Sequence, residues 1–102
     1  MLDHSTRNNL ETVDSAQAVL SGLAPDGGLY VPEVIPQADV ESCLHCGTAG
    51  TAARIISALL PDIPNMDALV SRGYTGKFQT EELTPTVEAG PFTVLELFRG
   101  PT

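Results

Sequence analysis

The sequence has little positive charge and few aromatic residues. Thirteen acidic residues outnumber five basic ones, which gives a net charge of −8 over 102 residues. Because so acidic a chain is repelled by phosphate backbones and anionic lipid headgroups, binding to nucleic acid or to a membrane surface is disfavoured. Tryptophan is absent, and the aromatic residues are two Tyr and three Phe. Aliphatic side chains must therefore form most of any core.

The sequence also lacks long apolar runs and has two cysteines. No run approaches the roughly 20 apolar residues that cross a bilayer. Asp3 stands where a secretory signal peptide would carry bases, and no apolar segment follows it. These absences predict a cytoplasmic protein whose cysteines are reduced. With 42% apolar residues, the chain is long enough for one domain, 1–102, with a modest core.

The rest of the chain is organised around residues 22–32, Gly-Leu-Ala-Pro-Asp-Gly-Gly-Leu-Tyr-Val-Pro. Gly22 suits the left-handed position after a helix, and the following proline stops the helix from resuming. Asp26, Gly27 and Gly28 then favour a tight turn. The remaining residues predict a short strand, 29–31. The turn is not a phosphate-binding loop, because Gly-Lys-Ser/Thr and a following helix are missing.

Other segments predict a mixed α/β domain with short strands and three or four flanking helices. Asp14 with Gln17 resembles a capping box for a helix that Gly22 stops. Residues 92–98 are apolar on both faces, which predicts a buried strand beside 29–31. The further expectations are a weak strand at 2–6, helical segments at 40–46, at 51–60 (capped by Thr51) and from 64 to a cap at Gly73, core positions for Tyr74 and Phe78, and a loop at 80–91.

The pair Cys43 and Cys46, with His45 between them, has the C-x-x-C spacing of metal-binding and redox sites. A tetrahedral zinc site needs four ligands, and His4 is the single other histidine. A redox pair would follow a strand, and none is predicted there. We therefore favour the interpretation that Cys43 and Cys46 are small, apolar-like side chains on a helical face, and we assign no metal site.

The run His4-Ser5-Thr6-Arg7 offers a base, a nucleophile and a cation, but neighbouring residues in a strand point to opposite faces. A catalytic triad is therefore disfavoured. Arg7 remains a candidate contact for an anionic ligand. The carboxylates Glu81, Glu82 and Glu88 fall in the predicted loop and indicate a solvated acidic face. By themselves these residues predict a soluble α/β domain without a complete active site.

Three motifs resemble the N-terminal domain of threonine synthase: Ser5-Thr6-Arg7, the run 22–33, and Leu-Glu-Leu-Phe-Arg-Gly-Pro-Thr at 95–102. In that family the last motif usually has His at the position of Arg99 and continues as Leu-Ala-Phe-Lys-Asp. The pair Cys43 and Cys46 is not a feature of the family. A buried-type strand that runs into a Gly-Pro turn at the last residue looks like a chain cut short.

The resemblance implies the first part of a fold-type II pyridoxal-phosphate enzyme, which converts O-phospho-L-homoserine and water to L-threonine and phosphate. Gly100, Pro101 and Thr102 would lead to the cofactor-binding lysine, four residues beyond Thr102. No residue present is then catalytic or cofactor-binding, Arg7 is a substrate-adjacent candidate, and the partner is the remainder of the synthase chain. The chain alone is expected to be inactive.

Two alternatives stay open. One is a stand-alone acidic interaction or regulatory module that kept this domain and lost the catalytic body. The other is a small thiol-metal protein that uses Cys43, His45 and Cys46.

Overall fold

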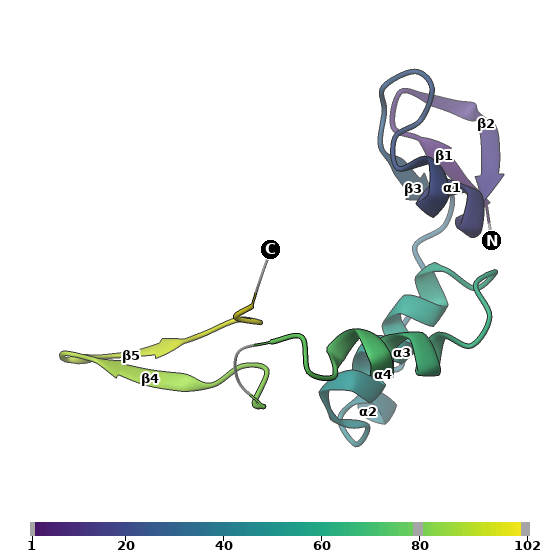
Figure 1. The fold of residues 1–102 in the computed structure, drawn as a ribbon. Helices are drawn as coiled ribbons and strands as arrows, with labels where there is room; N and C mark the ends of the chain where they lie inside the picture. The colour runs from purple at the N-terminus through teal and green to yellow at the C-terminus, as the bar shows by residue number, and fades with distance from the viewer. Residues whose placement is uncertain (1, 79–80, 101–102) are drawn as a thin grey trace. The chain divides into compact units, whose positions relative to one another are not determined.

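The computed structural model describes residues 2–78 and 81–100, and the chain divides into two compact units, 1–67 and 68–102. We describe each unit by itself. The first contains a three-stranded sheet and most of the helical residues, and the second contains a β-hairpin (Figure 1). The mixed α/β class with short strands is confirmed. One domain over 1–102 stays a prediction.

The sheet of the first unit is antiparallel, in the order β2-β1-β3. Strand β1, Leu2–Ser5, pairs with β2, Asn8–Asp14, and with β3, Tyr30–Pro32. The predicted strands at 2–6 and 29–31 are confirmed. Strand β2 was not predicted, because most of its side chains are polar and exposed, as an edge strand allows.

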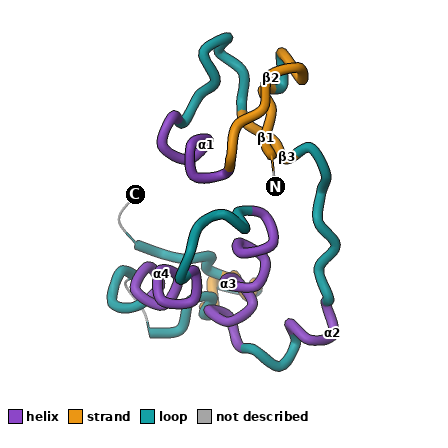
Figure 2. Tube along the Cα trace, turned by 90° about the vertical axis from the view of Figure 1, so that its right-hand side faces the viewer, coloured by secondary structure: helices purple, strands orange, loops and turns teal. Residues whose placement is uncertain are grey.

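Helix α1, Ser15–Ser21, begins and ends where the sequence predicts. The Asp14 carboxylate accepts the Gln17 N–H at 2.7 Å, and Gly22 closes the helix with φ at 72°. Figure 2 shows α1 lying beside the sheet, where it packs against β1 and β2. This packing buries Ser15 and Ala18.

Helices α2, Val40–Cys43, and α3, Gly47–Leu59, follow an extended segment. The capping role predicted for Thr51 is wrong, because α3 begins at Gly47 and continues through Gly50. The Thr51 hydroxyl donates instead to the Cys43 carbonyl oxygen at 2.9 Å. The end of α3 before Pro61 is confirmed.

Helix α4, Met66–Tyr74, begins near the predicted position. Its predicted cap, Gly73, is wrong because the helix continues through Tyr74. The Tyr74 ring contacts the rings of Phe78 and Phe98, with centroid separations of 5.9 and 6.0 Å. Phe78 and Phe98 also contact each other, at 5.7 Å.

The second unit contains a hairpin of β4, Thr86–Ala89, and β5, Phe92–Leu95. Gly90 takes φ of 61° at the turn between them, the sign that tight hairpin turns require. The predicted loop over 80–91 is therefore wrong at β4. This segment is a strand because it pairs with β5, and its own residues do not indicate that pairing. The buried strand predicted at 92–98 is also wrong, because β5 is exposed and pairs with β4, whereas β3 pairs with β1.

The described residues bury few apolar side chains, namely Ala18, Ala24, Ala53, Met66 and Val70. Nineteen Leu, Ile, Val and Phe residues of the described part are exposed, among them Leu10 at 89% and Phe92 at 69%. So large a share of exposed apolar side chains is more than single scattered residues would give, and it indicates surface that another segment or partner covers. Within 2–78 and 81–100, no helix has the length and hydrophobicity that a membrane crossing requires.

Candidate functional site

The strongest candidate site is formed by the turn between β1 and β2 and by the loop before β3. We call Ser5, Thr6, Arg7, Asp26, Gly27 and Gly28 the Arg7 cluster. Thr6 and Arg7 connect the paired residues Ser5 and Asn8. The Thr6 N–H donates to the Leu29 carbonyl at 2.8 Å, and the Leu29 N–H donates to the Thr6 hydroxyl at 3.1 Å. These bonds hold two segments together that are far apart in the sequence.

The Asp26 carboxylate organises the cluster. Its Oδ1 accepts the Ser5 hydroxyl at 2.7 Å and the Gly28 N–H at 2.8 Å. The Ser5 hydroxyl, then the Gly28 amide and the positive charge of Arg7, lower the pKa of Asp26, although partial desolvation opposes them. Asp26 is therefore ionised at neutral pH. Since the Ser5 hydroxyl donates to a carboxylate and not to His4, it is not an activated nucleophile.

Two glycines make this arrangement possible. Gly27 has φ of 78°, and a Cβ there would lie 3.0 Å from Arg7 Nη1. A Cβ on Gly28 would overlap the Ser5 hydroxyl oxygen. The close approach of Ser5 thus requires glycine at position 28. The sequence of the turn does not by itself predict this requirement.

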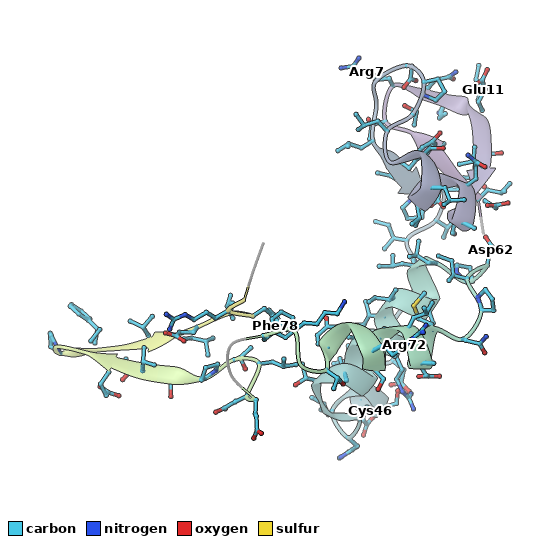
Figure 3. All side chains as sticks on the ribbon, in the orientation of Figure 1. Arg7, Glu11, Cys46, Asp62, Arg72 and Phe78 are labelled. Atoms are coloured by element: carbon cyan, nitrogen blue, oxygen red, sulfur yellow. The ribbon has the colours of Figure 1, made fainter. Side chains whose placement is uncertain are left out.

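Arg7 is held at the edge of the cluster with its guanidinium exposed (Figure 3). Its Nη1 donates to the Asp26 carbonyl at 2.9 Å, and its backbone N–H donates to the Ser5 hydroxyl at 3.1 Å. The guanidinium has five N–H groups and the side chain is exposed, so those not bonded to Asp26 can bind a phosphate or carboxylate. A hollow of about 410 Å³ adjoins the cluster, but the acids Glu11 and Asp26 line it, so it does not suit an anion.

The structure does not combine Cys43, His45 and Cys46 into a site. Both thiols are free, and the Cys46 thiol donates to the Ser42 carbonyl at 3.1 Å. His45 is exposed. Across the described residues, no group of three or more His, Cys, Asp or Glu side chains could hold a metal ion.

The predicted approach to a cofactor lysine falls partly outside the described residues, since Pro101 and Thr102 are not described. Gly100 is described, and a Cβ there would lie 3.0 Å from the Lys77 carbonyl. Arg99 pairs with Glu96 at 3.3 Å. Among the acids of the predicted loop, Glu88 accepts the Thr93 hydroxyl at 3.0 Å in the hairpin.

The described residues do not fit pyridoxal phosphate by themselves. The sequence has one lysine, Lys77, and its side chain is exposed after α4. A lysine that binds this cofactor needs a desolvated pocket, where its pKa is lowered enough for the free amine to react. No catalytic step is therefore derived from the residues of this chain.

A buried acid was missed by the sequence reasoning. Asp3 in β1 is 4% exposed, and its Oδ2 has no hydrogen-bond partner among the described residues. Ser5 lies on the same face of the strand and is also buried. The two-residue period of β1, with Ser5 facing inward, could have placed Asp3 inside as well.

Comparison with known proteins agrees with the motifs. The family model described as "Threonine synthase N terminus" matches residues 4–74. Threonine synthase from Corynebacterium glutamicum is 41% identical, over 82% of this chain and 20% of the relative. Threonine synthase from Saccharomyces cerevisiae is 32% identical, over 96% of this chain and 22% of the relative.

Solved structures give the same result for the fold. The crystal structure of yeast threonine synthase matches with a TM-score of 0.76 and 30% identity, over 97% of this chain and 22% of that one. Pyridoxal-phosphate-bound threonine synthase from Brucella melitensis matches with a TM-score of 0.75 and 29% identity, over 99% and 23%. The chain thus spans about a fifth of the length of the curated relatives it matches. With the family model covering most of its length, this chain belongs to the threonine synthase N-terminal family.

Proposed function

We propose that this chain acts as the N-terminal part of a threonine synthase, which uses pyridoxal phosphate to convert O-phospho-L-homoserine and water to L-threonine and phosphate. The observation that carries the proposal is the match, along nearly the whole chain, to the N-terminal part of threonine synthases. Most residues of this chain would have a structural role, Arg7 would lie beside the substrate, and the rest of the synthase would hold the cofactor. Cytoplasmic location and reduced cysteines belong to the same proposal.

The exposed apolar side chains support a role inside a larger protein. A self-sufficient domain of this length would bury more than five apolar residues, four of them no larger than valine, within its described part. The rest of the synthase would cover the exposed apolar surface. A stand-alone acidic module would need another partner for the same surface.

The test is a chimera in which this chain replaces the matching N-terminal part of the C. glutamicum enzyme. We expect the chimera to bind pyridoxal phosphate, with the visible absorption band of the lysine-bound cofactor, and to release phosphate from O-phospho-L-homoserine. The free chain should do neither, because it lacks a suitable lysine. The C. glutamicum enzyme without its N-terminal part is the control for the contribution of this chain.

A chimera that melts cooperatively and binds the cofactor, yet releases no phosphate, would contradict the proposed function. If the chimera instead bound no cofactor while the free chain folded stably, the interaction module would become the better hypothesis.

Arg7 is the substrate-adjacent residue within this proposal. Its exposed guanidinium matches the phosphate of O-phospho-L-homoserine in charge and hydrogen-bonding geometry. We expect Arg7→Met in the chimera to raise KM for the phosphorylated substrate about tenfold, equivalent to about 1.4 kcal/mol, with little change in kcat. Arg7→Lys should retain part of the affinity, since it keeps the charge.

Steady-state kinetics of the chimera measure both parameters. Arg72→Met is a matched control, because it removes an exposed arginine from the last turn of α4. If Arg7→Met changed the melting temperature and left KM unchanged, Arg7 would be a brace for the loop and not a substrate contact.

A further inference from the structure

The wall of one apolar pocket contains an acid without a partner among the described residues. Within the first unit, a pocket of about 430 Å³ is lined by Asp3 and by apolar side chains of α1, β3 and the end of α3. Val19 and Leu29, two of its lining residues, are more than half exposed. The mouth of the pocket is therefore exposed, whereas Asp3 lies in its buried wall.

The Asp3 carboxylate lies in an environment that is unfavourable for it. Buried charges in proteins are nearly always paired, because removing an ionised carboxylate from water is costly. Asp3 has neighbours in the sheet on both sides, but its paired residue on β3 is Pro32, which has no N–H to donate. The described part of the chain supplies no donor to Oδ2.

A second buried polar group lies near the start of α1. Ser15 is fully buried, and its side chain lies beside the Asp62 carboxylate. Its backbone N–H donates to the Asp62 carboxylate at 3.2 Å, which lowers the pKa of Asp62. The backbone at this position is thus fixed, which leaves Asp3 as the acid of this pocket whose Oδ2 has no partner among the described residues.

We propose that this pocket receives an arginine or lysine side chain from the remainder of the synthase, with its apolar stem against Val19 and Leu29 and its cationic head on Asp3. The inference rests on the proposed function. An apolar wall around a single anion selects a side chain with an alkyl stem and a positive end. The occupant lies outside this chain, which spans about a fifth of its relatives, and the net charge of −8 favours a cationic partner.

The chemistry of the pocket can be tested on the free chain with n-butylguanidinium as the probe. We expect it to raise the melting temperature and to shift the amide resonances of Val19 and Leu29. Guanidinium alone and n-butanol alone should have weaker effects, since the first lacks the alkyl stem and the second lacks the positive charge. Asp3→Asn should weaken binding of the probe about tenfold, because it removes the charge and keeps the shape.

Glu11→Gln is the matched control, because it removes an exposed acid from β2 outside this pocket. It should leave binding of n-butylguanidinium unchanged. Equal binding by the wild type and Asp3→Asn would overturn the proposal.

The occupant is tested in the chimera. There, Asp3→Asn should lower the melting temperature more than it does in the free chain, because a paired charge is lost only when the rest of the synthase is present. An active chimera that loses no more stability on Asp3→Asn than the free chain does would overturn the inference while leaving the proposed function intact. An inactive chimera in which Asp3→Asn still shows the larger loss of stability would contradict the proposed function and leave the assignment of the pocket intact.

Discussion

Replacement of Gly28 with Val is expected to destabilise the chain by about 3 kcal/mol. Its Cβ would occupy the position of the Ser5 hydroxyl oxygen, which is bonded to Asp26. Either Ser5 must leave the Asp26 carboxylate or the loop must move away from β1. Because Gly28 also accepts the Ala24 N–H through its carbonyl, movement of the loop would break backbone bonds as well. Urea denaturation followed by circular dichroism measures the change.

Two other glycines serve as comparisons. Gly27→Val should destabilise the chain by about 1 to 3 kcal/mol, because a β-branched residue is strained at a φ of 78°. Gly73→Ala should be neutral or stabilising by up to about 1 kcal/mol, since it lies within α4 and a Cβ there would meet no atom within 4 Å. Wild-type denaturation curves for both valine variants would show that the turn is assigned wrongly.

The reliable sequence predictions are those with local causes. Asp14 with Gln17 and the stop at Gly22 define α1, because capping groups bond within one turn of the residues they cap. The turn at Gly27 is likewise set by its own backbone. Thr51 misled the prediction of α3 because a contact outside the local sequence outweighs its preference for a capping position: its hydroxyl donates to the Cys43 carbonyl, eight residues earlier.

The unsuccessful predictions concern pairing between strands. An apolar segment such as 92–95 indicates a strand but not its partner, and β5 pairs with the adjacent β4 across a short turn. The apolar pattern predicted burial, whereas the described structure leaves β5 exposed. Under the proposed function the two observations agree, because the apolar pattern would then reflect contacts with the rest of the synthase.

The candidate site could be predicted only in its parts. The motif Ser5-Thr6-Arg7 and the turn at Asp26 were both noted, but their contact depends on the pairing of β1 with β2 and β3. A separation of 21 residues between Ser5 and Asp26 leaves no local signal for that hydrogen bond. The environment of Asp3 depends on the same sheet.

The apolar face of the hairpin is expected to make the free chain self-associate. The pairs Val87–Val94 and Ala89–Phe92 place four apolar side chains on one face of β4 and β5, and the described residues leave them exposed. A two-stranded hairpin is only marginally stable when nothing covers it, so a second copy can stabilise it by burying this face. Sedimentation velocity over a range of concentrations should detect dimers or larger species.

Replacement of Phe92 with Ser should weaken this association about tenfold, which corresponds to about 1.4 kcal/mol. Phe92 is 69% exposed, so its loss removes little packing within the chain, and the melting temperature at low concentration should be almost unchanged. Thr93→Ala is the control on the opposite face, since it removes only the exposed bond to Glu88. A wild-type chain that stays monomeric, or equal association of the two variants, would show that this face does not mediate self-association.

In the chimera, where the rest of the synthase would cover the same face, Phe92→Ser should instead lower the melting temperature, because the serine would replace a buried ring.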